Sequence, residues 1–286
     1  MAEVQTATRV ALVGNDASPT NLAIAAAWRE ADVDVSIVAA SEVRPDDVVI
    51  GRLDILRSLT GVERGLLELL WLERRGVRVL NRARTLVTAH DKLLTARVLV
   101  RAGLPHPRTL HVHAVEPLPE LEPPVVVKPR VGSWGVDVFR CDTPEQLRRC
   151  LDEVATRPWF HRHGVLVQEL VPPLGYDLRL IVSGGVVVGS VRRVAAPGEW
   201  RTNVSLGATR HPVVAPPAAC ELAVAAARAI GGDFVGVDLL PCDGGYTVIE
   251  LNGSPDFNAT YSLPGRDVFL DAAAALGLAA VATRRC

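Results

Sequence analysis

Short apolar runs alternate with amphipathic stretches through the first third of the chain. The runs are rich in β-branched residues and end in polar or glycine turns, which is typical of buried parallel strands. They cover Arg9–Gly14, Val33–Val38, Asp47–Ile50 and Val77–Leu80. Apolar positions with helical spacing lie between them, at Asn21–Glu30 and Gly65–Arg75. This alternation predicts a small open α/β domain at the N-terminus.

The pattern then changes to one helix, a linker and a series of strands. Thr88–Gly103 has a helical pattern that Gly103 and Pro105 would end, so it predicts a single helix. Glu116–Pro124 is rich in Pro and Glu and indicates a linker. Strands are predicted at Val125–Lys128, Val165–Val171, Leu178–Ser183, Val186–Val194, Phe234–Leu240 and Tyr246–Asn252, and helices at Glu221–Ile230 and Asp267–Leu276.

Composition and charge narrow the class of protein. The 286 residues carry 31 basic and 32 acidic side chains, a net charge of −1, which argues against a general nucleic-acid or anionic-membrane binder. Five cysteines are scattered without zinc-like spacing, which favours a reducing, cytoplasmic setting. The first residues are polar and give no signal peptide, and no apolar stretch reaches the ~18 residues of a membrane span.

The last predicted hairpin carries two acids in otherwise apolar strands. Asp238 and Glu250 would each cost several kcal/mol to bury unless they are paired or bind a metal. Closing the hairpin at Leu240 and Tyr246 places Val248 opposite Asp238 and makes Glu250 its diagonal neighbour. Glu250 and Asn252 share a face, and two carboxylates with an amide oxygen suit Mg²⁺. Salt bridges from these acids to arginines are the structural alternative.

Lysine is rare in this chain, whereas arginine supplies most of the positive charge. Lys92 lies at a helix start, and Lys128 ends an apolar strand before the glycine loop Gly132–Gly135. An ammonium group beside glycine amides suits a phosphate chain. Taken alone, the spacing is weak evidence for such a site and favours a surface lysine whose stem packs on apolar neighbours.

Further polar residues gather at strand ends in the second half. Gln168 and Glu169 end an apolar strand whose backbone could pair with a base. Asp177 and Arg179 share one strand face, with Arg193 in the facing strand, an arrangement that favours binding of a carboxylate or phosphate. The first loop, Gly14–Ser18, lacks the glycine spacing of dinucleotide binders, and no Walker, GxSxG or HExxH motif occurs.

The order of these motifs resembles the RimK-type branch of the ATP-grasp superfamily. The resemblance covers nearly the whole chain and rests on the motifs taken together. They are Asp91-Lys92, Val125–Gly135, Gln168-Glu169, Asp177–Arg179, Arg193, Gly198–Gly207, Gly236–Asp238 and Val248–Pro255, with Val49–Arg52 and Val79–Asn81 in the first domain.

The resemblance implies an α/β fold of the ATP-grasp type with three parts. They are an N-terminal α/β domain at 1–87 and an ATP-grasp domain at 88–286, the latter divided into a mobile lid at about 121–167 and a C-terminal antiparallel-sheet subdomain at about 168–286. ATP would lie between the lid and the C-terminal subdomain.

The same resemblance implies roles for individual residues. The nucleotide would be bound by Lys92, Lys128, Gly132, Ser133, Gly135, Gln168, Glu169, Leu170, Val171, Asp177, Arg201, Thr202 and Asn203. Two Mg²⁺ ions, with Mn²⁺ as an alternative, would be held by Asp238, Glu250 and Asn252, and Glu250 would bridge them. Arg179 and Arg193 would be catalytic and hold the substrate carboxylate and the acyl phosphate.

Two positions depart from the family pattern. Asp137 stands in the lid loop where the family often has glycine, and it would repel phosphate if it pointed inward. Asp256 follows Ser254-Pro255 where the family often has glycine, so the substrate end is expected to differ.

The resemblance therefore implies an ATP-dependent carboxylate–amine ligase that forms an acyl phosphate. It would attach an amino acid such as glutamate to a small molecule, peptide or carrier protein. A phosphotransferase on the same scaffold and a non-catalytic ATP sensor are the alternatives. No nucleic-acid or membrane partner is expected, a homodimer or homotetramer stays open, and the sequence names neither substrate.

Overall fold

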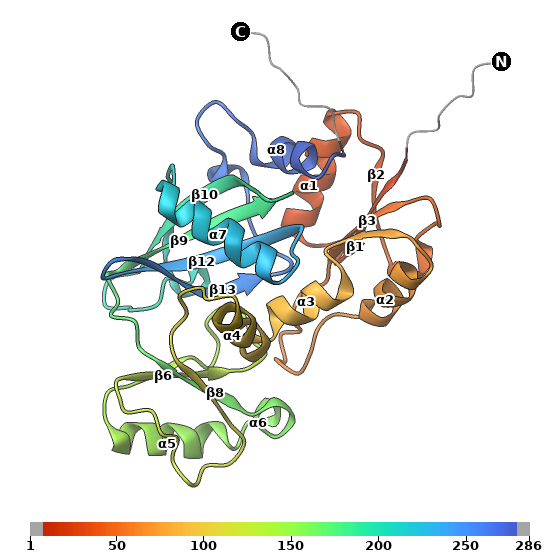
Figure 1. Ribbon diagram of the computed structural model, residues 1–286. Helices are drawn as coiled ribbons and strands as arrows, with labels where there is room; N and C mark the ends of the chain where they lie inside the picture. Colours follow the sequence, from red (N-terminus) through yellow and green to blue (C-terminus); the bar gives the residue numbers. More distant parts are fainter. Residues whose placement is uncertain (1–7, 279–286) are drawn as a thin grey trace, which may run out of the picture.

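The first sheet of the computed structural model, which describes residues 8–278, is parallel and four-stranded (Figure 1). Its order is β2 (Val35–Val38), β1 (Val10–Gly14), β3 (Val48–Arg52) and β4 (Arg78–Leu80). Helices α1 (Pro19–Glu30), α2 (Leu66–Arg74) and α3 (Ala83–His90) connect and cover these strands. The predicted open α/β arrangement is therefore confirmed. Residues 1–7 and 279–286, including Cys286, lie outside the described part of the chain.

The predicted helix Thr88–Gly103 is two helices, so that prediction was wrong. Helix α3 ends at His90 and α4 (Lys92–Arg101) begins two residues later. Asp91 between them has extended backbone angles, and its carboxylate accepts from the backbone N–H groups of Leu93 and Leu94. An aspartate that caps the second helix interrupts a hydrophobic period that is otherwise continuous.

A second, antiparallel sheet forms the lower part of the molecule in Figure 1. Its order is β5 (Thr109–Val112), β8 (Val165–Glu169), β6 (Val125–Pro129) and β7 (Phe139–Cys141). Helices α5 (Pro144–Val154) and α6 (Pro158–His163) pack on it through Leu151 and Trp159. Strand β8 ends two residues before the predicted Val171, and β5 precedes the expected lid start near residue 121.

The third sheet has five antiparallel strands and carries the two predicted hairpins. Its order is β11 (Thr209–Pro212), β10 (Val186–Val194), β9 (Tyr176–Ser183), β12 (Phe234–Cys242) and β13 (Gly245–Asn252). Helix α7 (Pro217–Ala229) covers the face that carries Leu178, Leu180 and Val237. The opposite face carries Asp177, Arg179 and Ile181, as period-2 alternation requires.

The pairing of β12 with β13 corrects the predicted register. The strands close at Cys242 and Gly245, and a bulge between Asp238 and Leu239 shifts the pairing, so that Leu239 lies opposite Val248 and Asp238 directly opposite Glu250. The predicted partner of Asp238 was Val248, with Glu250 on the diagonal. The bulge adds one residue to β13 and brings the two acids closer in register than the prediction had them.

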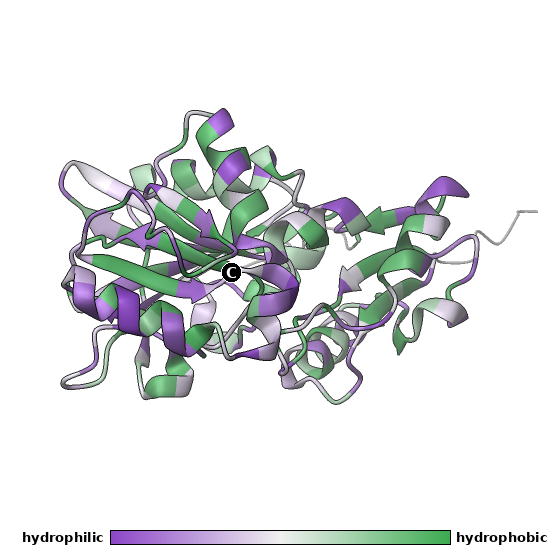
Figure 2. Cartoon of the chain, turned by 90° about the horizontal axis from the view of Figure 1, so that it is seen from below, coloured by the Kyte–Doolittle hydropathy of each residue, from purple (hydrophilic) through white to green (hydrophobic). Residues whose placement is uncertain are grey.

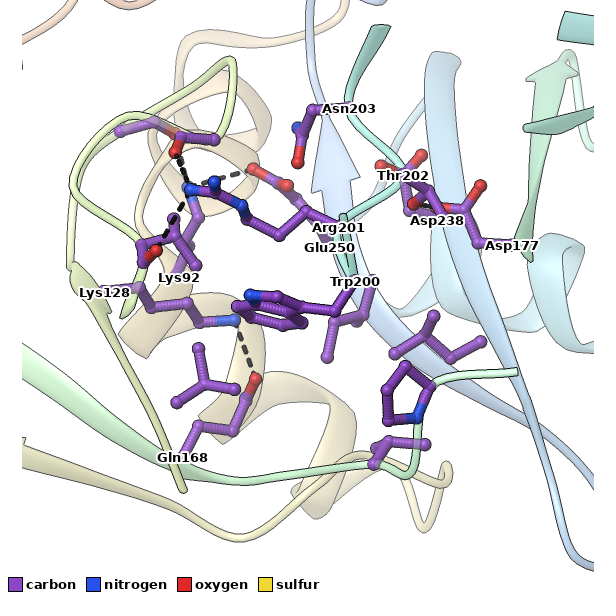
Figure 3. A pocket seen from close by; sticks show the side chains of 18 of the residues that line it. Lys92, Lys128, Gln168, Asp177, Trp200, Arg201, Thr202, Asn203, Asp238 and Glu250 are labelled. Carbon is purple, nitrogen blue, oxygen red and sulfur yellow. Dashed lines mark hydrogen bonds and ion pairs between the residues drawn. The ribbon is translucent and has the colours of Figure 1, made fainter. Parts of the chain in front are cut away.

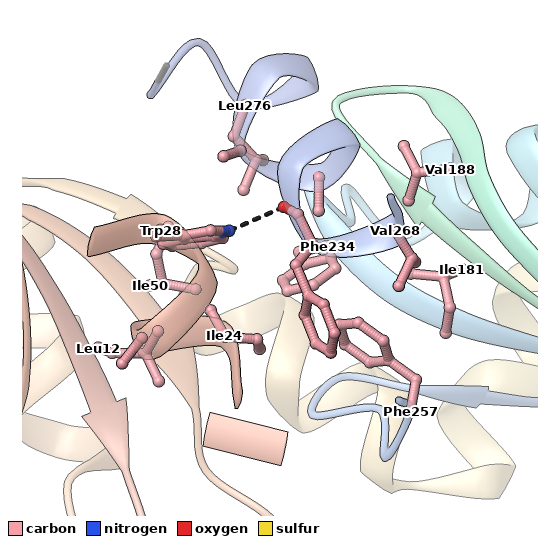
Figure 4. Packing of buried hydrophobic residues seen from close by; sticks show 14 of the residues in the cluster. Leu12, Ile24, Trp28, Ile50, Ile181, Val188, Phe234, Phe257, Val268 and Leu276 are labelled. Carbon is pink, nitrogen blue, oxygen red and sulfur yellow. Dashed lines mark hydrogen bonds between the residues drawn. The ribbon is translucent and has the colours of Figure 1, made fainter. Parts of the chain in front are cut away.

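One hydrophobic core joins the first sheet to the third (Figure 4). Leu12 and Ile24 belong to the same cluster as Phe234 and Phe257, which come from the C-terminal part. Helix α8 (Val268–Ala275) completes it, and Trp28 of α1 donates its Nε1–H to the carbonyl of Phe269 at 2.8 Å. Figure 2 shows that hydrophobic segments concentrate in the strands, whereas the outer helices carry hydrophilic stretches.

The cysteines and the length of the helices can also be compared with the sequence in the described residues. Cys141, Cys150, Cys220 and Cys242 are free thiols. Between residues 8 and 278, no helix has both the length and the apolar composition that crossing a membrane requires.

Candidate functional site

A cavity lies between the second and third sheets and collects most of the predicted site residues. It encloses about 920 Å³ of empty space, a volume that includes the part open to solvent. Its wall includes Lys92, Lys128, Gly132, Ser133, Gly135, Gln168, Glu169, Leu170, Val171, Asp177, Arg193, Arg201, Thr202, Asn203, Asp238 and Glu250. Of the predicted residues, Arg179 and Asn252 are not part of this wall.

The two lysines of the chain both face this cavity (Figure 3). Lys92, the first residue of α4, forms an ion pair with Oε1 of Glu250 at 2.9 Å and also donates to the carbonyl of Gly132. Lys128, at the end of β6, donates to Oε1 of Gln168 at 2.7 Å. Neither is a surface lysine, since Lys128 is only 6% exposed and the side chain of Lys92 only 11%.

The environment of Lys128 weakens its hold on its proton. Burial lowers the pKa of Lys128 to about 8, and the nearby positive charge of Lys92 adds to the effect. Glu250 acts in the opposite direction. A buried cation without a full counter-charge is well placed to receive an anionic ligand.

The glycine loop Gly132–Gly135 packs against the loop that carries Arg201. Gly135 has φ +72°, and a Cβ there would lie 2.8 Å from Oδ1 of Asn203, so only glycine fits. Arg201 donates through Nη1 to the carbonyls of Gly135 at 3.3 Å and Val138 at 3.1 Å. Glu199 holds the same guanidinium at 2.7 Å. The loop therefore presents backbone groups and one arginine to the same cavity wall.

Asp137 does not face the cavity, which answers the concern about phosphate repulsion. Its backbone has φ +52°, in the left-handed region that glycine adopts without steric cost and other residues rarely adopt. Its carboxylate accepts from Nε1 of Trp159 at 2.8 Å, on the side of helix α6. The negative charge is therefore turned toward Trp159 and the core of the second sheet.

A row of paired charges crosses the third sheet at the cavity floor. Strand register places Arg193 opposite Asp177, and Arg179 opposite Asp238. Arg179 binds the two oxygens of Asp238 at 2.6 Å each, and Arg193 donates both to Asp177 and, at 2.9 Å, to Asp238. Thr202 adds a hydrogen bond to Asp177 at 2.6 Å. The predicted shared face is thus confirmed, and the pairing fixes both guanidinium planes.

These arginines decide the charge state of Asp238. Burial alone would raise its pKa, but the charges of Arg179 and Arg193 and their hydrogen bonds outweigh burial and hold the pKa at about 2. Asp238 is therefore ionised at neutral pH. Because each carboxylate oxygen has two lone pairs, it can accept from an arginine and still bind a cation.

The oxygen donors of the predicted metal set lie on neighbouring positions of β12 and β13. Asp238 lies directly opposite Glu250, and Asn252 follows on the same face of β13. Nδ2 of Asn252 is buried without a hydrogen-bond partner in the described residues. Two carboxylates and an amide oxygen are hard ligands that fit Mg²⁺ or Mn²⁺.

The structure adds cavity residues that sequence reasoning missed. Apolar side chains form much of the wall, and Figure 3 shows Trp200 projecting into the cavity beside Lys128. The others are Val126, Pro129, Val136, Val138, Pro173, Leu240 and Ile249. Some of them lie inside the quoted motifs, but an apolar residue there gives no sign that it lines a cavity rather than a core. Only the contact between two sheets shows that they line a cavity.

His106 is a second residue that the sequence did not single out. Burial lowers its pKa to about 4, with Lys128 contributing, so the ring is neutral at pH 7. Its Nδ1 lies 2.8 Å from the carbonyl of Val248 and its Nε2 lies 3.3 Å from Nε2 of Gln168. The ring thus connects β13 to the side chain that contacts Lys128.

Comparison with known proteins agrees with this geometry. A family model for the RimK-like ATP-grasp domain matches residues 89–274. The chain is 32% identical over 202 residues to a probable α-L-glutamate ligase of Pseudomonas paraeruginosa, covering 68% of this chain and 66% of that protein. It is 32% identical over 263 residues to the glutamate–LysW ligase ArgX of Sulfurisphaera tokodaii, covering 87% and 91%.

A solved structure shows the same fold. The structure of the D-cycloserine synthetase DcsG superposes with a TM-score of 0.69 at 22% identity, covering 94% of this chain and 99% of that chain. The likeness at this identity concerns the fold, and the family match rests on the sequence. The chain belongs to the RimK-like ATP-grasp family.

Proposed function

We propose that the protein is an ATP-dependent carboxylate–amine ligase that forms an amide bond through an acyl phosphate. The observation that carries this proposal is the single cavity in which the chain's two lysines, the lid glycines and the row of paired charges meet. Named relatives are ligases that act with glutamate, which supports the reaction class.

In this proposal, the nucleotide occupies the space between the lid sheet and the five-stranded sheet. Lys92, Lys128 and Arg201 neutralise its phosphates, and the loop Gly132–Gly135 covers them. The base lies against the strand end Gln168–Val171, where Trp200 and the aliphatic wall offer apolar surface. Asp177 would hold the ribose, with Thr202 and Asn203 beside the phosphates.

Asp238, Glu250 and Asn252 would hold two Mg²⁺ ions, with Mn²⁺ as a substitute. Such ions supply charge neutralisation for the transferring phosphoryl group. Glu250 forms an ion pair with Lys92 at 2.9 Å. A cation bound to Glu250 would replace this ion pair and free the ammonium group of Lys92 to contact the phosphates. Lys92 is the first residue of α4, so the helix fixes the backbone from which its side chain reaches both Glu250 and the cavity.

The chemistry needs two steps, because a carboxylate has no good leaving group at neutral pH. A carboxylate oxygen of the substrate forms a bond with the γ-phosphorus as the bond to the β–γ bridging oxygen breaks, and ADP leaves. The amine nitrogen then attacks the acyl carbon, phosphate departs with the bonding electrons, and the nitrogen loses a proton. Arg179 and Arg193 would contribute positive charge and their remaining N–H groups to the acyl phosphate, and the closed lid would exclude water.

For the substrates, we propose that an amino acid such as glutamate is attached to the carboxylate of a small molecule, peptide or carrier protein. The matched segment spans 66% of the Pseudomonas relative's length, so its full activity is not carried over. A cytoplasmic setting and a homodimer or homotetramer also stay predictions.

A screen for amine-dependent phosphate release tests the reaction class. The protein is incubated with ATP, Mg²⁺, carboxylates and a panel of amino acids, and ADP, phosphate and new products are measured by coupled assay and mass spectrometry. A ligase needs both partners and yields a product heavier by the amino acid less water. A phosphorylated carboxylate released without any amine would instead indicate a phosphotransferase, and nucleotide binding without ADP formation would indicate a sensor.

The metal assignment is tested by Glu250→Gln, a nearly isosteric change. We expect ADP formation to be abolished and the thermal unfolding temperature to change little, because Glu250 faces the cavity. Glu153→Gln, on the exposed side of the lid helix, is the matched control and should turn over normally. Normal turnover by Glu250→Gln with Mg²⁺ would show the assignment to be wrong.

A further inference from the structure

The turn that follows Asn252 is held by the N-terminal domain at five consecutive residues. Asn81 donates to the carbonyl of Gly253 at 2.9 Å. The next two residues bond to Arg52, and the last two accept from Thr20. These bonds are Ser254 Oγ to the Arg52 carbonyl at 3.1 Å, Arg52 Nη2 to the Pro255 carbonyl at 2.8 Å, and Thr20 Oγ1 to Asp256 Oδ1 at 2.5 Å and to the Phe257 carbonyl at 3.2 Å.

Arg52 is the central member of this set because it uses both its backbone and its side chain. It ends β3, is only 2% exposed, and its Nε donates to Oδ1 of Asn21 at 2.5 Å. Its Nη1 is buried without a hydrogen-bond partner in the described residues. Burying a guanidinium with an open donor is costly, so its side chain does more than fill space.

The turn is directly connected to the proposed metal ligands. It follows Asn252 in sequence, and Gly236, which pairs with Asn252, lies so close to the turn that a Cβ on it would meet Pro255 at 2.9 Å. A shift of the turn would therefore move the end of β13, which carries Glu250 and Asn252. Residues behind metal ligands orient them and tune metal affinity.

We propose that Arg52 is a positioning residue that sets the geometry of the Glu250–Asn252 strand end from the N-terminal domain. It does so by holding Ser254 and Pro255 together, so the metal site is complete only when the two domains are joined. This inference rests on the proposed function for its metal readout, and it adds a role for the N-terminal domain that the cavity wall does not show.

The test compares Arg52→Lys with Arg78→Lys. Arg78 of β4 also connects the N-terminal part to the C-terminal part, because it donates to the carbonyl of Leu276 at 3.0 Å. Leu276 lies at the end of α8 and is not part of the cavity wall. ADP affinity is measured by calorimetry with and without Mg²⁺, and hydrogen–deuterium exchange is followed over residues 253–257. Ser254→Ala removes a single bond of the same turn and serves if Arg52→Lys does not fold.

For Arg52→Lys we expect the ADP affinity without Mg²⁺ to stay near that of the wild type. The factor by which Mg²⁺ increases ADP affinity, here called the Mg²⁺ gain, should fall about tenfold, and hydrogen–deuterium exchange at residues 253–257 should be faster. Ser254→Ala should show a smaller change of the same kind, and Arg78→Lys none. A lower unfolding temperature with unchanged Mg²⁺ gain and unchanged exchange in the turn would overturn the proposal. If the wild type itself showed no Mg²⁺ gain, the metal assignment would fail, and exchange in the turn would still decide whether Arg52 positions it.

Discussion

Lys128 illustrates how a residue acquires its chemistry from burial. In the sequence it is a lysine at a strand end, a position that favours a surface lysine. In the structure it is enclosed, bonded to Gln168 and close to Lys92, so its pKa falls to about 8. A ligand phosphate in the cavity would supply the missing counter-charge and restore the protonated form.

Nucleotide affinity is therefore expected to depend on pH through Lys128. Above about pH 8 the free protein loses this charge, so the dissociation constant for ADP should rise by up to tenfold per pH unit. Calorimetry between pH 7 and about pH 9.5 measures it, and Lys128→Arg, which stays charged, should flatten the profile. Lys128→Ala should weaken binding at every pH, and unchanged affinity in that variant would contradict the phosphate assignment.

The same shift has a consequence for stability. The pKa of Lys128 is lower in the folded protein than the 10.5 of an unperturbed lysine, so the unfolded state binds more protons between about pH 8 and that value. The contribution of Lys128 to the free energy of unfolding is therefore lowest below pH 8 and rises with pH between about pH 8 and 10.5. Because the chain has only two lysines, acetylation rates followed by mass spectrometry give the pKa of each directly.

At the scale of elements, two local irregularities place the site. The break at Asp91 turns the chain so that α4 begins with Lys92, and the bulge in the β12–β13 pair brings Asp238 opposite Glu250. Asp91 also forms an ion pair with Arg130 at 2.5 Å, two residues beyond Lys128. Asp91 thus ends α3, caps α4 and joins it to Arg130, the residue that follows β6.

Replacing Asp91 should therefore destabilise the protein more than replacing an ordinary cap. We expect Asp91→Ala to cost more than the ~1 kcal/mol of a lost cap, because a partly buried ion pair is lost as well. Asp91→Ser keeps a capping oxygen and should be intermediate. Thr143→Ala, at the exposed cap of α5, is the control with a single bond, and urea unfolding measures all three. Equal losses for Asp91→Ala and Thr143→Ala would contradict this account.

At the scale of the whole molecule, the N-terminal α/β sheet and the C-terminal sheet share one core. Leu12 and Phe234 belong to a single cluster, and Trp28 reaches α8 with a hydrogen bond. The proposed boundaries, 1–87 for the first domain and about 121–167 for the lid, stay predictions. Ile55 and Leu59 of the N-terminal part also pack into the core of the second sheet, so a loop of the N-terminal part reaches that sheet.

This shared core predicts that the two parts unfold together. Trp28→Phe should lose the bond to Phe269 and cost about 1–3 kcal/mol, since a buried carbonyl is left without its donor. Heat-induced unfolding followed by far-ultraviolet circular dichroism and by differential scanning calorimetry should show one transition in the wild type and in this variant. Trp71→Phe, at an exposed site, is the control and should change little. Two separated transitions in the wild type would contradict a common core.

The sequence by itself determined the element types, the ATP-grasp order of motifs and most of the cavity wall. Those features depend on local period and on residues such as Lys92 and Lys128, whose chemistry stands out against an arginine-rich chain. Only the tertiary structure decided the helix break at Asp91, the bulge beside Asp238 and the apolar wall around Trp200. The break is a local cap that the continuous hydrophobic period hides, because Asp91 accepts from the N–H groups of Leu93 and Leu94. The bulge and the apolar wall arise where separate segments meet, because register and burial depend on a partner that the local pattern does not contain.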